Sequence, residues 1–149
     1  MSETDDEPRY RRLEAWRCSD DLAVEAIKVA RKLPRETESI AQQIIKCSTS
    51  APANIAEGYG RASNKEFAQH LVVAHGSLFE LDYWFHLLLR IELLDEATAN
   101  KLMADCRKAS RLVYGLMRSA RGDVRNKDGQ RRYLREPREI YVAGGGDDE

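Results

Sequence analysis

The segment at residues 50–67, SAPANIAEGYGRASNKEF, most constrains what this chain can fold into. It joins two strongly helical segments and carries a proline, two glycines, an asparagine and an Asn-Lys-Glu helix start. It holds no metal-ligand cluster, no phosphate-binding loop and no activated nucleophile. The segment therefore predicts a fixed corner that ties two helices together, and it indicates an architecture more directly than an activity.

Four segments of the chain have a helical pattern, because their apolar residues recur at three- and four-residue steps. The first two predicted helices cover about residues 13–33 and 35–58. The third starts at residue 63. A short loop near residues 94–95 separates it from the fourth, which covers about residues 96–120. Pro34 ends the first, since proline disfavours helix in the residue before it. Ser63 and Glu66 have the capping-box spacing at the start of the third.

The second helix contains two kinds of helix-breaking residue. Pro52 lies inside its apolar pattern and removes one backbone donor, so the sequence predicts a kink or a split near residues 47–50. Gly58 and Gly60 are expected to stop the helix, as glycine does at a left-handed cap.

The pattern predicts an all-α fold. Short loops make neighbouring helices antiparallel, so the expected fold is an up-down-up-down four-helix bundle over residues 13–121. Residues 1–12 are expected to form a flexible arm. Residues 122–149 are expected to form a flexible tail, first basic and then acidic; residues 118–138 hold eight Lys or Arg and three Asp or Glu.

Composition limits the compartment and the partners. The net charge is −1, so any contact with nucleic acid must rest on a local patch. Three widely spaced cysteines, Cys18, Cys47 and Cys106, are typical of a reduced cytoplasmic protein. The polar N-terminus does not resemble a signal peptide, and no apolar run reaches the roughly 18 residues of a membrane span. We expect a cytoplasmic protein with no membrane partner.

The sequence favours a protein that is not an enzyme and has no cofactor. The Glu-x-x-His pairs of di-iron bundles are absent, and GYGR lacks the P-loop lysine. His75 and His86 lie about 16 Å apart along one helix, too far to share a metal within one chain. A ring of histidines around a symmetry axis is the remaining metal hypothesis. We expect no catalytic residue, no metal site and no small-molecule substrate.

The third helix predicts self-association. Ten of the fourteen residues from Leu78 to Ile91 are apolar or aromatic, more than one inward face can bury. The candidate interface residues are Phe79, Tyr83, Trp84 and Leu87. The alternative is that the aromatic rings lie flat on the surface of a monomeric bundle. We expect a closed homo-oligomer.

Two further sets of residues are candidates for structure or binding. The helix-corner set is Pro52, Asn54, Glu57, Gly58, Gly60 and Arg61, with Asn54 bonding carbonyls freed by Pro52 or a neighbouring helix and Glu57 pairing with Arg61 one turn on. The candidate nucleic-acid contacts are Arg61, Lys65, Arg125, Arg131, Arg132 and Arg135. Solvation of a helix end and of a basic tail is the alternative interpretation.

These residues resemble a known family, the four-helix-bundle proteins encoded in 23S rRNA intervening sequences. The accessory variability determinant of diversity-generating retroelements is similar. The resemblance covers Leu13 to Arg121 and centres on the NIAEGYGR block. The matching positions are Leu13, Trp16, Pro34, Pro52, Asn54, Ile55, Ala56, Glu57, Gly58, Gly60, Arg61, Glu66, Phe67, Leu71, Ala74, Gly76, Ser77, Glu80 and Leu81.

The resemblance implies an antiparallel bundle that assembles as a homopentamer, with no catalytic residues. It also implies a scaffold or accessory role in contact with RNA or DNA or with a nucleic-acid enzyme. The retroelement protein is markedly basic, whereas this chain is near neutral, so its tail would have to supply a local basic ring. The alternative function is a purely protein-binding adaptor with no direct affinity for nucleic acid.

Overall fold

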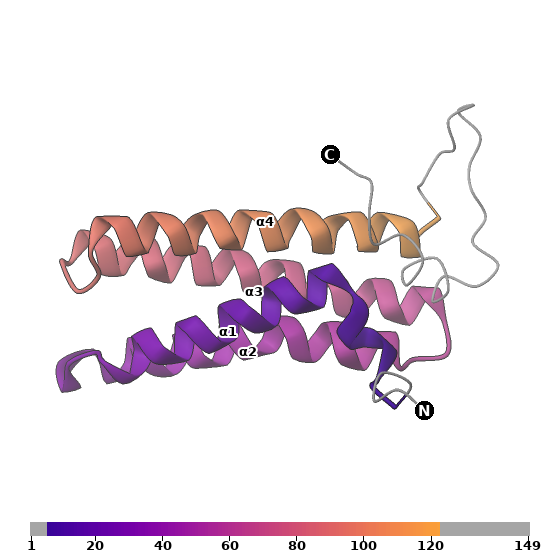
Figure 1. Ribbon diagram of the computed structural model, residues 1–149, viewed down its shortest axis with the longest axis horizontal. Coiled ribbons are helices and arrows are strands. Elements are labelled where there is room, and N and C mark those ends of the chain that lie inside the picture. Colours follow the sequence, from indigo (N-terminus) through magenta and orange to yellow (C-terminus); the bar gives the residue numbers. More distant parts are fainter. Residues whose placement is uncertain (1–5, 123–149) are drawn as a thin grey trace.

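The computed structural model describes residues 6–122, and within that range the chain is helical with no strand. The long helices are α1 (Glu14–Arg31), α2 (Glu38–Tyr59), α3 (Asn64–Arg90) and α4 (Glu96–Ala120), and two 3-10 turns, η1 (Arg9–Arg12) and η2 (Arg35–Thr37), precede α1 and α2. The four long helices lie side by side, with the α2–α3 connection at one end and the α3–α4 connection at the other (Figure 1). None of the described helices is both long and apolar enough to span a bilayer.

The start of α3 and the limits of α4 confirm the sequence predictions. The Oγ of Ser63 accepts a hydrogen bond from the Glu66 amide at 3.2 Å and donates one to the Glu66 carboxylate at 3.1 Å. Asp95 caps α4 by accepting from the Thr98 amide at 2.9 Å. Both caps satisfy amide groups that have no partner inside the helix.

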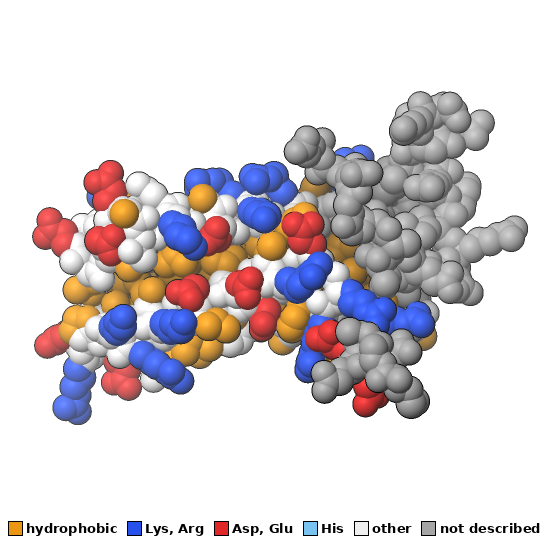
Figure 2. Space-filling view, viewed as in Figure 1, with side chains coloured by type: hydrophobic (Ala, Val, Ile, Leu, Met, Phe, Trp, Pro, Cys, Tyr) orange, Lys and Arg blue, Asp and Glu red, His pale blue; other side chains and the backbone are white. Residues whose placement is uncertain are grey.

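The core lies along the inward faces of the helices, as their periodicity predicts. Charged side chains of both signs cover much of the visible surface, and apolar side chains show between the helices (Figure 2). The predicted inward residues of α3 are all buried: Phe67, Leu71, Ala74, Leu78, Leu81, Phe85 and Leu88. Because this face repeats over the whole of α3, the helix is fixed between α2 on one side and α4 on the other.

α2 corrects part of two expectations, the split at Pro52 and the left-handed cap, although the helix does end at the predicted glycines. The helix runs unbroken through the buried Pro52, so it is not split there. Gly60 follows the last helical residue with φ −76°, which is right-handed, so the predicted left-handed glycine cap is wrong. The amide of Gly60 instead continues the helical pattern to the carbonyls of Ala56 and Glu57, at 3.2 and 3.1 Å.

Gly58 is required for a different reason, the close approach of α2 and α3. A Cβ atom placed on Gly58 would lie 2.6 Å from the Cβ of His70 and 3.0 Å from the ring of Phe67. Real Cβ atoms essentially never come that near, and the first obstacle is a Cβ fixed to the α3 backbone. The absence of a side chain at Gly58 therefore sets the spacing of the two helices at the corner.

The α3–α4 connection closes with paired backbone hydrogen bonds. The amides of Leu93 and Glu92 donate to the carbonyls of Leu88 and Leu89 at 2.9 and 3.1 Å. Glu92 has φ +62°, the left-handed conformation that usually falls to glycine after a helix. The chain therefore reverses in a few residues, near the predicted loop.

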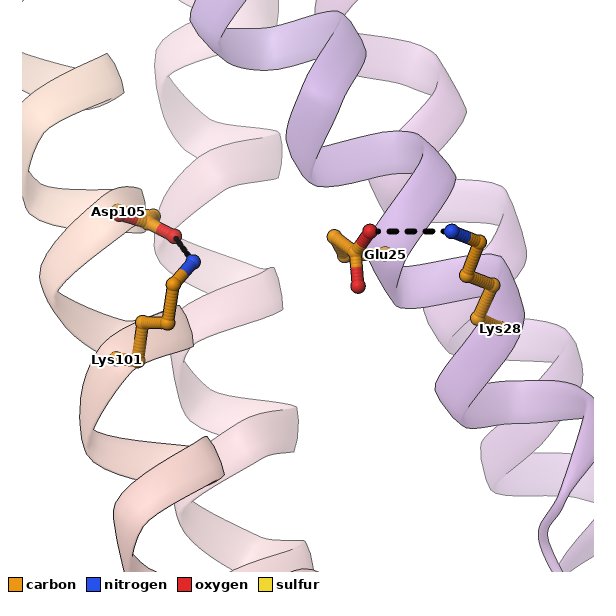
Figure 3. A network of polar contacts seen from close by, with 4 residues as sticks. All are labelled: Glu25, Lys28, Lys101 and Asp105. Atoms are coloured by element: carbon orange, nitrogen blue, oxygen red, sulfur yellow. Dashed lines mark hydrogen bonds and ion pairs between the residues drawn. The ribbon is translucent and has the colours of Figure 1, made fainter.

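Charged side chains line the boundary between α1 and α4. Lys28 pairs with Glu25 at 3.3 Å on α1, and Lys101 pairs with Asp105 at 3.0 Å on α4, with the two pairs facing each other (Figure 3). The hydrogen bond to Asp105 raises the pKa of Lys101, and Glu25 adds a smaller contribution. These pairs are exposed, so each contributes little to the free energy of unfolding.

Helical structure begins before the predicted limit of the bundle. Residues 9–12, assigned to the N-terminal arm, form η1, and the ring of Tyr10 packs edge-on against Trp16 with centroids 5.2 Å apart. Residues 1–5 and the tail beyond residue 122 lie outside the described residues.

The close approach at Gly58 makes a testable prediction. Gly58→Ala should lower the free energy of unfolding by about 1–3 kcal/mol, because the added methyl forces α2 and α3 apart. Gly115→Ala is the matched control: nothing lies within 4 Å of the position that its methyl group would take, so the better helix former should raise stability by about 0.5–1 kcal/mol. Urea unfolding at one protein concentration measures both, and equal stabilisation by the two changes would contradict the prediction.

Candidate functional site

A polar ladder joins α2 to α3 beside Gly58. The side-chain amide of Asn54 donates to the Ser50 carbonyl at 2.8 Å, and its Oδ1 lies 3.1 Å from Nδ1 of His70. Ser50 lies one turn before Asn54 on α2, and its Oγ accepts a hydrogen bond from Ser77 of α3 at 3.0 Å. The contact with His70 confirms the predicted bond to a neighbouring helix. The predicted bond to a carbonyl freed by Pro52 is wrong, because Pro52 frees the carbonyl of Ser48 and Asn54 bonds that of Ser50.

The predicted pairing at the end of α2 is confirmed. The guanidinium of Arg61 lies 2.6 Å from the Glu57 carboxylate, and both side chains are about half exposed. An exposed pair of this kind contributes little to stability, but it neutralises much of the charge that Arg61 brings to the corner. The structure thus associates Arg61 with the helix corner more closely than with a phosphate site.

Lys65 lies at the end of the bundle where α3 begins and α4 finishes, called here the basic end because Lys65 and Arg121 meet there. It lines a surface hollow of about 450 Å³ together with Arg121, the residue that follows α4, and the apolar wall comes from Ala68, Val72 and Ala120. The other predicted nucleic-acid contacts, Arg125, Arg131, Arg132 and Arg135, lie outside the described residues. The chain passes out of the described range at Gly122, directly beyond this hollow.

A row of basic residues on α4 was not predicted from the sequence. Arg107, Arg111, Arg118 and Arg121 recur at four-, seven- and three-residue steps, which places them on one face over about 21 Å. Residues 107–121 include five Lys or Arg and no Asp or Glu. The heptad spacing could have revealed this row, but only the inward residues of this helix enter the sequence prediction.

The two flanks of α4 differ in how their cations are paired. On the flank toward α1, Lys101 pairs with Asp105, and Lys108 lies 3.9 Å from Glu14. Within residues 6–122, the arginine row has no ion pair. Figure 2 shows Lys and Arg side chains gathered at the end of the visible face where α1 begins. Positive charge is therefore local, although the net charge of the chain is −1.

The predicted oligomer contacts on α3 divide into two environments. Phe79 is 62% exposed and Tyr83 is 52% exposed, whereas Trp84 and Leu87 are half-buried. The ring of Tyr83 packs on Trp84 with centroids 5.0 Å apart, while Phe79 packs on His75 at 4.9 Å. α3 therefore displays exposed aromatic surface on the side away from the core.

Burial disfavours ionisation of the three cysteine thiols. Burial raises the pKa of the Cys47 thiol to about 12 and also raises the pKa values of Cys18 and Cys106. All three are free thiols, and at neutral pH they stay protonated, which makes them poor nucleophiles and poor metal ligands. No group of three or more His, Cys, Asp or Glu side chains in the described range is placed to hold a metal ion.

Comparison with known proteins supports the same fold. The model of a family described as 23S rRNA-intervening sequence protein matches residues 11–115, which include α1, α2, α3 and most of α4. The chain is similar to a crystallised protein of unknown function from the S23 ribosomal protein family of Bacteroides thetaiotaomicron. That likeness has a TM-score of 0.65 and 24% identity, and it covers 70% of this chain and 95% of that chain. No curated protein matches the sequence.

The Asn54–His70 contact can be tested with a double-mutant cycle. Asn54→Ala and His70→Ala should each lower the free energy of unfolding by about 1 kcal/mol. The double variant should lose about 0.5–1 kcal/mol less than the sum, because either change alone already removes the shared contact. Asn100→Ala, at an exposed position on α4, is the control, and its effect should add to that of His70→Ala. Additive losses for Asn54 and His70 would show that the contact contributes nothing.

Proposed function

The chain belongs to the 23S rRNA-intervening sequence protein family, and we propose that it is a non-enzymatic, oligomeric scaffold or accessory protein that contacts nucleic acid or a nucleic-acid enzyme. The arginine row on α4 carries this proposal. It presents several cations on one rigid helix face, and none of them forms an ion pair within residues 6–122. Phosphate neutralisation by such side chains supplies most nonspecific affinity for nucleic acid.

The hollow beside Lys65 and Arg121 extends this basic surface. The candidate contacts Arg125, Arg131, Arg132 and Arg135 follow in the sequence and lie outside the described residues. A near-neutral chain can offer a locally positive contact region, because attraction to phosphates depends on charge within about 10 Å at physiological salt.

The protonated thiols and the lack of a described metal-ligand cluster support a role without catalysis. Free cysteines also agree with a cytoplasmic location, which forms part of the same proposal.

We extend the proposal to an antiparallel up-down-up-down bundle. Contacts between neighbouring helices support this topology, since rising residue numbers on one helix meet falling numbers on the next. Ser50 and Asn54 of α2 meet Ser77 and His70 of α3 in that order.

A homopentamer is the proposed assembly. The aromatic surface of α3 around Tyr83 and its neighbour Trp84 supports self-association, because a lone bundle would leave Tyr83 in water. A functional kinship with the retroelement accessory protein belongs to the same proposal.

Nucleic-acid binding is tested with structured RNA and duplex DNA at two salt concentrations. We expect the full-length chain to bind, with affinity that falls steeply as salt rises. Neutralising Lys65, Arg118 and Arg121 together to Gln should lower the slope of log affinity against log salt by about 2–3, because each lost phosphate contact removes about one unit. Neutralising the four tail arginines measures the contribution of the tail separately.

The matched control carries the same number of charge changes elsewhere: Arg31→Gln, Lys46→Gln and Arg90→Gln. All three positions are exposed and lie outside the arginine row. A slope that changes equally in both variants would show a general charge effect and no contact at the basic end. Absence of binding by the unchanged protein at both salts would overturn direct nucleic-acid contact and leave a protein-binding adaptor, which the exposed surface of α3 would then serve.

Assembly is tested by light scattering at micromolar concentration. The pentamer should have a mass of about 85 kDa, five times the 17.0 kDa chain. Tyr83→Glu should reduce that mass, since it puts a charge into the proposed apolar contact. Val24→Glu, at a similarly exposed apolar position on α1, should leave it unchanged. A mass of 17 kDa for the unchanged protein would contradict self-association.

A further inference from the structure

A groove between α3 and α4 combines aromatic and charged side chains in one space. Its volume is about 550 Å³, within the range of pockets that hold small organic groups. Its walls include His75, Phe79 and Asp82 of α3, and Arg107, Arg111 and Tyr114 of α4. The buried side chains of Leu78 and Cys106 give it an apolar lining.

Three rings form one cluster along the groove. The His75 ring lies 4.9 Å from that of Phe79 and 5.8 Å from that of Tyr114, measured between centroids. Phe79 is 62% exposed and Tyr114 is 47% exposed, so both present aromatic surface to solvent. Partial burial lowers the pKa of His75, so at neutral pH its ring is uncharged. The cluster therefore offers faces on which a planar ring can stack.

Two cations stand beside this cluster. Arg107 and Arg111 are exposed and lie one turn apart on α4, and no acidic side chain within residues 6–122 forms an ion pair with either. A guanidinium binds phosphate through two parallel hydrogen bonds. Asp82, the acidic residue of the described lining, can accept hydrogen bonds from ring or amino N–H groups. The ligand that satisfies all of these groups has a planar ring with N–H donors and an attached phosphate.

We propose that the α3–α4 groove binds an unpaired nucleotide of a single-stranded nucleic acid, with the base stacked on Phe79 and Tyr114 and the phosphate bound by Arg107 and Arg111. This inference rests on the proposed nucleic-acid function and assigns it to particular side chains. Duplex bases cannot stack there because they are already stacked on each other. Single strands are recognised in this way, through aromatic platforms beside a positive surface.

Arg118 and Arg121 continue the row from the groove toward the basic end. A strand whose base occupies the groove can therefore follow α4 with its phosphates on successive arginines, over the same 21 Å or so that the row spans by helix rise. The groove would provide preference for unpaired bases, and the rest of the row would provide affinity for the backbone.

The test uses the full-length protein and a short single-stranded RNA, the matching DNA strand, and the duplex of the same sequence. Tyr114→Leu keeps an apolar side chain but removes the ring, and it should weaken binding of both single strands about tenfold while leaving duplex binding unchanged. Tyr114→Phe should restore the affinity. Arg107→Gln should weaken the single strands more than Lys46→Gln, its control on the exposed face of α2.

A free mononucleotide and inorganic phosphate separate the sources of the ligand chemistry. Competition by the mononucleotide but not by phosphate supports a site that needs the base as well as the charge. Circular dichroism should show unchanged helix content in Tyr114→Leu, because this side chain lies outside the core.

Three outcomes would overturn the inference. Single-strand affinity that is unaffected by Tyr114→Leu, yet lost when Lys65, Arg118 and Arg121 are neutralised, would reject the groove and leave the proposed function standing. A lower assembly mass for Tyr114→Leu would show that a second copy of the chain covers the groove. Absence of binding to every nucleic acid would remove the proposed function and this inference together.

Discussion

The close approach of α2 and α3 at Gly58 is the constraint on which the rest of the structure depends. With 2.6 Å between a hypothetical Cβ at this position and the Cβ of His70, any side chain would push the helices apart. The same spacing lets Asn54 meet His70 at 3.1 Å and Ser50 meet Ser77 at 3.0 Å. Polar groups this near the core need such partners, since an unpaired one costs about 1–3 kcal/mol. The absence of a side chain at Gly58 and the hydrogen bonds of Asn54 and Ser50 to α3 therefore fix the same spacing of α2 and α3.

That geometry determines what α3 and α4 present to solvent. Once α3 is seated against α2, its inward residues pack the core, and Phe79 and Tyr83 must face outward. α4 then lies against the other side of α3, which brings Tyr114, Arg107 and Arg111 next to the rings of His75 and Phe79. Because the contributing side chains stand on helices, their relative positions are fixed more firmly than they would be on loops.

The surface also shows how a near-neutral chain can have a directed charge. Acidic partners neutralise Lys101 and Lys108 on the flank of α4 that faces α1. On the flank that faces α3, Arg107 and Arg111 have no ion pair within the described residues, and aromatic rings stand beside them. Cations on one flank of α4 are paired with acidic side chains, and those on the other flank are not. A chain with a net charge of −1 therefore carries a local positive stripe. Composition alone cannot show this, because it sums over both flanks.

The sequence by itself determined the four long helices and the start of α3, but not how α2 ends. Apolar periodicity predicted the buried face of α3, and Ser63 and Glu66 predicted its start, because these signals act between residues a turn or less apart. The Glu57–Arg61 pair was predictable for the same reason. Only the tertiary structure decided the role of Gly58, which spaces two helices instead of capping one. Only the tertiary structure, too, placed Asn54 against His70 and the arginines of α4 beside the rings of α3. These arrangements depend on distances between residues far apart in the chain, which helix packing fixes and local pattern does not.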